Sequence, residues 1–97
     1  MLDQIAVAID DTTNDICIAG HTDNLPIHSE RYPSNWELSA YRGLTVLNYF
    51  LEENGLPPSR FSVGGYGASR PLKPNSSKEN SAINRRVEII FKHLEDA

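Results

Sequence analysis

Apolar residues near the start of the chain follow two different periods. Helical spacing is present in the first ten residues, at Leu2, Ile5, Ala6 and Ile9. A turn cluster at 11–14 separates them from an unbroken apolar run at 16–19. Such a run is typical of a strand covered on both faces. We therefore predict a helix at 2–10 and a strand at 15–19.

The second helix is marked at both ends. Ser34, with Glu37 three residues later, forms a capping box, and Gly55 is placed to end the helix. Between these signals the apolar residues recur at intervals of four, three and four. We expect this stripe to face the core: Ala40, Leu44, Leu47 and Leu51, flanked by Gly43 and Phe50.

The last third of the chain predicts two strands around a short helix. Residues 61–67 favour a strand in which glycines allow a ligand or backbone to approach closely. Ser76 and Glu79 form another possible capping box, which opens a helical turn reaching Asn84. Residues 87–92 alternate between the two faces of a strand, one of them more exposed.

The predicted order is therefore helix-strand, three times over. Strands joined by a helix favour a parallel arrangement with right-handed crossovers. The sequence thus predicts an α/β two-layer sandwich, formed by a single domain that covers residues 1–97.

Composition narrows the possible functions. A net charge of −4 argues against a general nucleic-acid binder, which needs a basic face. The one cysteine, Cys17, lies within a strand pattern and is interpreted as a small buried hydrophobe. No apolar run approaches the ~18 residues of a membrane span. The start of the chain lacks the basic segment of a signal peptide, so any export signal or anchor would lie outside this sequence.

One constellation suggests binding chemistry. The turn Gly20–Asn24 follows the first predicted strand, and a long polar loop leads from it to the helix that carries Arg42. An acid at a strand end and a base two turns into a helix are suited to a small zwitterion. The carboxylate would bind an ammonium group, and the guanidinium would bind a carboxylate in bidentate fashion. Amides at the helix N-terminus would add positive potential for the same anion.

Four motifs, in order, carry a family resemblance. They are Gly20-His21-Thr22-Asp23, Asn35-x-x-Leu38-Ser39-x-x-Arg42, Gly65-Tyr66-Gly67 and Asn84-Arg85-Arg86-Val87-Glu88. Together they resemble the OmpA-like peptidoglycan-binding domain, over residues 2–92. The loop at 24–39 is more similar to flagellar motor stator proteins of the MotB type, and some type VI secretion anchoring proteins carry a similar loop.

The resemblance implies a role for particular residues. It implies that Asp23 and Arg42 bind the two ends of the diaminopimelate side chain in the peptidoglycan stem peptide. It also places Arg85 at this site, with further residues around it: Thr22, Asn35, Leu38 and Asn84. Arg86 is interpreted as structural.

The implied function is non-catalytic attachment of an envelope complex to peptidoglycan. The resemblance points to a flagellar stator, and so to a periplasmic domain of a protein anchored in the inner membrane. A stator partner subunit would then bind through a membrane segment outside this chain. The alternative is a protein–protein assembly module, of a type VI secretion or other envelope complex, that does not bind the wall.

The chain departs from the family at its start. The family domain begins with a strand before its first helix, whereas this sequence starts within that helix. We therefore expect an OmpA-like β-α-β-α-β sandwich that is N-terminally truncated and lacks the first strand. Because an uncovered sheet edge pairs readily with another chain, we also expect a homodimer.

Other readings of these residues are simpler. Asp23 could be a turn acid and Arg42 a solvated helix residue. Aromatic side chains in and after the loop could stack on sugar rings or pack the loop onto the domain: Tyr32, Trp36 and Tyr41.

Metal and catalytic sites are not expected. Zinc sites have three or four ligands held by orienting partners, whereas here two histidines lie seven residues apart near one acid, with no cysteine nearby: His21, His28 and Asp23. No nucleophile motif surrounds Ser39, Ser62 or Cys17, so we predict neither an enzyme nor a cofactor.

Overall fold

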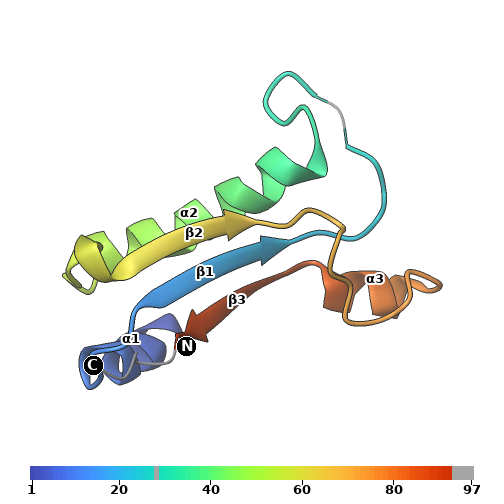
Figure 1. Ribbon diagram of the computed structural model, residues 1–97. Coiled ribbons are helices and arrows are strands. Elements are labelled where there is room, and N and C mark those ends of the chain that lie inside the picture. The colour runs from blue at the N-terminus through green and yellow to red at the C-terminus, as the bar shows by residue number, and fades with distance from the viewer. Residues whose placement is uncertain (28, 93–97) are drawn as a thin grey trace.

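The computed structural model describes residues 1–27 and 29–92. Over these residues the elements follow the predicted order (Figure 1). They are α1 (Leu2–Asp10), β1 (Ile16–His21), α2 (Asn35–Glu52), the 3₁₀ turn η1 (Pro58–Arg60), β2 (Phe61–Gly65), α3 (Lys78–Asn84) and β3 (Arg86–Phe91). The predicted element types are thus confirmed. The strand ends differ by a few residues, since β1 continues to His21 and β2 ends at Gly65.

The strands form one sheet in the order β2-β1-β3. The central β1 is parallel to β2 and antiparallel to β3, with Ile18 opposite both Val63 and Ile89. The expectation of parallel strands is therefore confirmed for β2 and wrong for β3. The connection from β2 to β3 is long enough for a crossover, but the helix within it, α3, has seven residues and is about 10 Å long, roughly half the length of a six-residue strand. It lies beyond one end of the sheet, and the chain turns back from it directly into β3 (Figure 1).

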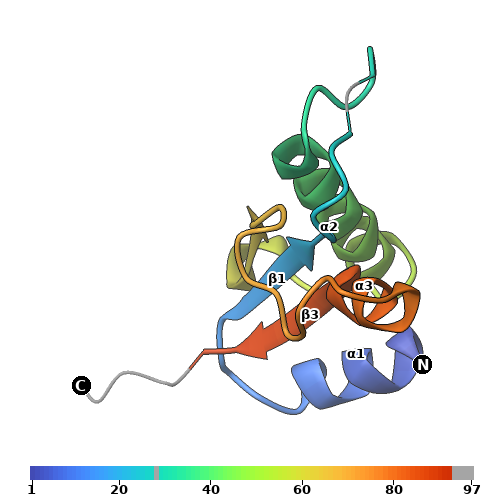
Figure 2. The ribbon, with the colours of Figure 1, turned by 90° about the vertical axis from the view of Figure 1, so that its right-hand side faces the viewer.

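Helices α1 and α2 lie on one side of the sheet (Figure 2). The core between these two layers contains Ile9 of α1, Ile16 and Ile18 of β1, and Phe50 of α2, all fully buried. This confirms the α/β two-layer sandwich. Both faces of β1 are largely covered, as its unbroken apolar run predicted, because Ala19 and His21 on the other face are buried as well.

Helix α2 approaches β1 very closely. A Cβ atom added to Gly20 would lie 1.9 Å from the backbone oxygen of Ser39, and one added to Gly43 would lie 2.9 Å from Cγ1 of Val63. The buried positions of α2 are Ser39, Gly43 and Phe50, whereas Leu44 is 45% exposed. The predicted core stripe was therefore wrong at Leu44, because small residues form the contact line where helix and strand are this close.

The helix ends follow the capping signals, with one shift. The Ser34 hydroxyl accepts from the Trp36 amide and donates to the Glu37 carboxylate, a bond that lowers the pKa of Glu37. After α2, Gly55 has a φ of +64°, the left-handed conformation that favours glycine. Helix α3 is capped by Ser77 and not by Ser76, because the Ser77 hydroxyl accepts from the Asn80 amide at 3.1 Å.

Candidate functional site

Three segments meet at the carboxyl end of β1. They are the turn that follows β1, the first turns of α2, and α3 with the residue after it (Figure 1). The glycine contact between β1 and α2 fixes the distance between the first two segments. This end of the sheet holds most of the residues expected at the ligand site.

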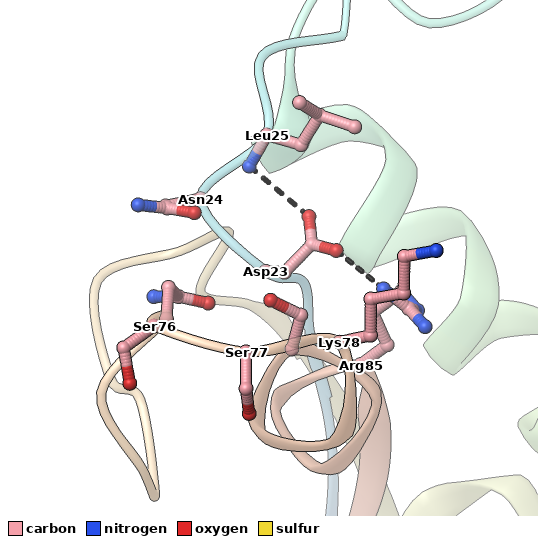
Figure 3. Close-up of a pocket in the computed structure, with 9 residues that line it drawn as sticks. Asp23, Asn24, Leu25, Ser76, Ser77, Lys78 and Arg85 are labelled. Carbon is pink, nitrogen blue, oxygen red and sulfur yellow. Dashed lines mark hydrogen bonds and ion pairs between the residues drawn. The ribbon is translucent and has the colours of Figure 1, made fainter.

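Asp23 is held rigidly in the turn. Its side chain is 13% exposed; Oδ1 accepts from the Leu25 amide at 3.1 Å, and Oδ2 accepts from Nη1 of Arg85 at 2.5 Å (Figure 3). The Thr22 amide donates to the Gly67 carbonyl at 2.9 Å, and the Thr22 hydroxyl donates to the Asp23 carbonyl at 2.8 Å. Thr22 is thus buried and anchors the backbone that presents the carboxylate.

Asp23 and Arg42 line the same cavity, whose volume is about 220 Å³. Its other lining residues come mainly from the loop and from α2: Thr22, Leu25, Pro26, Ile27, Asn35, Leu38 and Arg85. Within residues 1–27 and 29–92, the Arg42 guanidinium has no hydrogen bond or ion pair. An acid and an unpaired base therefore line one partly open cavity, together with the apolar side chain of Leu38.

Asn35 joins the loop to the start of α2. Its side-chain amide donates to the Leu25 carbonyl at 3.1 Å and, more weakly, to the Asp23 carbonyl at 3.5 Å. These bonds hold the segment after Asp23 against the helix that carries Arg42. Asn35 thus lines the cavity and also fixes its shape.

Arg85 lies between two cavities. Its side chain is 43% exposed, and it also lines a second cavity of about 470 Å³ together with Asp23 and Leu25 (Figure 3). The ion pair between Arg85 and Asp23 thus forms a wall common to both spaces. The Arg85 guanidinium also offsets the negative charge of the Asp23 carboxylate in the free protein.

Asn84 has a different place from the one expected. It is fully buried and does not line either of these two cavities. Its Oδ1 accepts from the amides of Leu72 and Lys73 at 2.9 and 3.1 Å. Its Nδ2 donates to the Lys73 carbonyl and to Oδ1 of Asn75, both at 2.9 Å. Because its amide group is fully used inside the domain, Asn84 positions the loop before α3 and does not face a ligand.

A buried histidine lies next to the site in sequence. His21 is 2% exposed, stacks on Tyr66 at a centroid distance of 5.2 Å, and its Nε2 lies 3.1 Å from Oε1 of Glu88. Burial, and then the nearby charge of Arg86, lower the pKa of His21. The hydrogen bond from Arg86 to Oε2 lowers the pKa of Glu88. Arg86 thus has the structural role expected of it, since it also donates to the Asn84 and Arg70 carbonyls.

Sequence reasoning missed two groups of lining residues. The apolar side chains that follow Asp23 line the smaller cavity, and their position directly after the motif was the available signal: Leu25, Pro26 and Ile27. The residues of the loop and helix near position 78 line the larger cavity: Asn75, Ser76, Ser77, Lys78 and Ser81. Within this second group, Ser76 was part of the predicted capping box, but no motif indicated a ligand site there.

Across residues 1–27 and 29–92, no three His, Cys, Asp or Glu side chains come together as metal ligands. His28, considered above as a metal ligand, lies outside the described residues. No helix among the described residues is long and apolar enough to cross a bilayer.

Comparison with known proteins gives the family. The OmpA family model matches residues 1–85, and the chain belongs to this family. YtxE of Bacillus subtilis is 48% identical over 92 residues, which is 95% of this chain and 38% of that protein. Motility protein B of the same organism is 40% identical over 76 residues, which is 78% of this chain and 29% of that protein. The chain thus spans about a third of the length of these relatives.

Solved structures agree with the sequence comparison. The C-terminal domain of Helicobacter pylori MotB superposes with a TM-score of 0.85 at 33% identity, covering 95% of this chain and 69% of that one. The cell wall anchor of the type VI secretion system from Pseudomonas aeruginosa superposes with a TM-score of 0.82 at 39% identity, covering 95% and 64%. The domain therefore has the OmpA-like fold and is similar to MotB, which confirms the resemblance found in the sequence.

Proposed function

We propose that this domain binds the peptide stem of peptidoglycan without catalysis, through the side chain of diaminopimelate. In this proposal the Asp23 carboxylate binds the ammonium group at the end of that side chain, and the Arg42 guanidinium binds the neighbouring carboxylate. Arg85 supports Asp23 and adds positive charge, while Thr22, Asn35 and Leu38 shape the cavity.

One observation carries the proposal. Asp23 and Arg42 come from different elements, yet they line one cavity of about 220 Å³, and Arg42 has no polar partner in the part of the chain that the structure describes. A guanidinium facing a cavity without a partner is suited to bidentate binding of a carboxylate. The Asp23 oxygens each accept one hydrogen bond and retain lone pairs for an incoming ammonium.

The charge balance of the cavity fits a zwitterionic group. Asp23 is offset by Arg85, so Arg42 leaves one uncompensated positive charge among the described lining residues. The carboxylate of the ligand would offset this charge, and its ammonium would share Asp23 with Arg85. A purely cationic side chain such as that of lysine would bind less well, because it would leave Arg42 unmatched.

The relatives suggest the cellular role. We propose that the domain lies in the periplasm, as part of a longer protein anchored in the inner membrane, and attaches a flagellar stator or a similar envelope complex to the wall. Similarity to Motility protein B and to the cell wall anchor of a type VI secretion system supports this role. One small ligand of this kind gives micromolar to millimolar affinity, so firm attachment would come from binding many sites on the polymer.

Co-sedimentation with purified sacculi tests the proposal. Asp23→Asn keeps a side-chain oxygen that can accept the hydrogen bond from the Leu25 amide. Arg42→Gln removes a guanidinium that has no partner among the described residues. Both variants are therefore expected to fold. Each should lose most of the sedimenting fraction. Lys92→Gln is a matched control, because it removes a charge at the opposite end of the sheet and should sediment like the wild type.

The same experiment separates this proposal from the alternative. An assembly module that does not bind the wall would fail to sediment with sacculi in its wild-type form. Binding that survived both Asp23→Asn and Arg42→Gln would show that another surface contacts the wall. Either result would refute the assignment of this cavity.

A further inference from the structure

The larger cavity, of about 470 Å³, has no part in the binding of diaminopimelate described above. It shares Asp23, Leu25 and Arg85 with the smaller cavity, so the ion pair between Asp23 and Arg85, drawn in Figure 3, is part of the lining of both. A ligand that reached Asp23 would therefore have its neighbouring groups at this wall. The volume is within the range of about 300–1,000 Å³ that is usual for ligand pockets.

The chemistry of this second space is cationic and hydroxyl-rich. Lys78 and Ser81 are three residues apart on one face of α3, and Arg85 is the residue directly after this helix; all three line the cavity. The described lining residues include two cations, Lys78 and Arg85, and a single carboxylate, that of Asp23, which Arg85 already pairs. One positive charge is thus left without a partner within residues 1–27 and 29–92.

The hydroxyl groups point to the same class of ligand. Ser76 and Ser77 each accept a hydrogen bond, from the Asn80 side chain and the Asn80 amide respectively, so their hydroxyl protons remain available for donation. Asn24 adds an exposed side-chain amide from the turn that follows β1. A group with several acceptor oxygens and a negative charge would match this set of donors.

We propose that the larger cavity binds a second carboxylate of the same peptide ligand, carried by a residue next to diaminopimelate, and that the Lys78 ammonium forms an ion pair with this carboxylate. This inference rests on the proposed function, because it places the ligand by its ammonium group on Asp23. It makes the domain specific for an acidic peptide that contains diaminopimelate, and not for the isolated amino acid.

The test is isothermal titration calorimetry of the 97-residue chain with three ligands, one capped amino acid and two capped tripeptides. The first is N-acetyl-diaminopimelate amide. The second and third are capped tripeptides in which two glutamates, or two glutamines, flank the diaminopimelate, so that either direction of the peptide is covered. The wild type should bind the glutamate peptide roughly fivefold more tightly than the glutamine peptide, the upper range for an ion pair at a partly exposed site.

Variants assign this preference to Lys78. Lys78→Gln should abolish it while leaving the affinity for N-acetyl-diaminopimelate amide unchanged. Lys73→Gln is the matched control, because it removes the same charge from an exposed side chain that does not line the cavity, and it should keep the preference.

The outcomes separate the two proposals. If the wild type binds both tripeptides equally, or if the preference survives Lys78→Gln, the second subsite is refuted while the binding of diaminopimelate stands. If N-acetyl-diaminopimelate amide does not bind the wild type at all, the proposed function fails, and this inference fails with it.

Discussion

Gly20→Ala should increase the distance between Asp23, which follows β1, and Arg42, which lies on α2. The added Cβ atom would lie 1.9 Å from the Ser39 carbonyl oxygen of α2, whereas ordinary contacts of a Cβ begin at 3.4 Å. The obstacle is helix backbone, so a side-chain rotation cannot relieve it. Helix α2 would have to move from β1 by about 1.5 Å, the difference between these distances. Arg42 would move with α2, while Asp23 would stay with β1.

The effect on binding and stability can be estimated. Overpacking of this kind costs about 1–3 kcal/mol of the free energy of unfolding. Hydrogen-bond lengths vary by only about 0.5 Å, so a displacement of 1.5 Å is too large for a hydrogen bond to absorb. A ligand could then reach Asp23 or Arg42, but not both. Losing one charge-assisted hydrogen bond costs about 1.5–3 kcal/mol, so the affinity for N-acetyl-diaminopimelate amide should fall roughly 10-fold to 150-fold.

Calorimetry and urea denaturation together check this prediction. Gly55→Ala is the control: its φ of +64° strains any residue with a Cβ, by about 1–2 kcal/mol, but no atom lies within 4 Å of the added group. It should therefore destabilise the domain to a similar extent without changing the affinity. If Gly20→Ala folds and binds the ligand like the wild type, the spacing of α2 and β1 does not set the geometry of the site.

Two further predictions concern residues around the site. Asn84→Ala should lower the free energy of unfolding by about 2–4 kcal/mol in urea, because the amides of Leu72 and Lys73 lose their acceptor; a loss below about 0.5 kcal/mol would contradict this role. The pKa of His21 is lowered below its usual value of 6.5, chiefly by burial, among Glu88, Arg86 and Arg70. The unfolded chain therefore takes up the proton first, and stability should fall as the pH drops through 6.5, the usual pKa of histidine. His21→Gln should make the free energy of unfolding depend less on pH. If the pH dependence is unchanged in this variant, His21 is not its cause.

The element types could be predicted because their signals are local. The Ser34 capping signal and the apolar run of β1 each depend on a few neighbouring residues, and the structure has both elements there. The direction of β3 could not be predicted, because periodicity indicates a strand but not its orientation in the sheet. The contact line of α2 was also missed, because Gly43 and Ser39 are buried by the close approach of β1, which depends on packing.

The binding site was likewise predictable only in part. The motif placed Asp23 and Arg42 near each other, and the structure has them lining one cavity. It did not indicate the ion pair between Asp23 and Arg85, which are 62 positions apart in the sequence, or the wall that this pair forms between two cavities. Asn84 was expected at the ligand because it belongs to a motif, but a motif does not show where a side-chain amide finds its partners.

The most direct test of the account measures both charged partners separately, by calorimetry with three capped residues. Diaminopimelate carries the ammonium and the carboxylate at the end of its side chain, lysine lacks that carboxylate, and 2-aminopimelate lacks that ammonium. We predict that Arg42→Gln weakens the binding of diaminopimelate but not of lysine, and that Asp23→Asn weakens the binding of diaminopimelate but not of 2-aminopimelate. If each variant instead weakens all three ligands equally, Asp23 and Arg42 do not bind the two ends of a zwitterion, and the central claim is wrong.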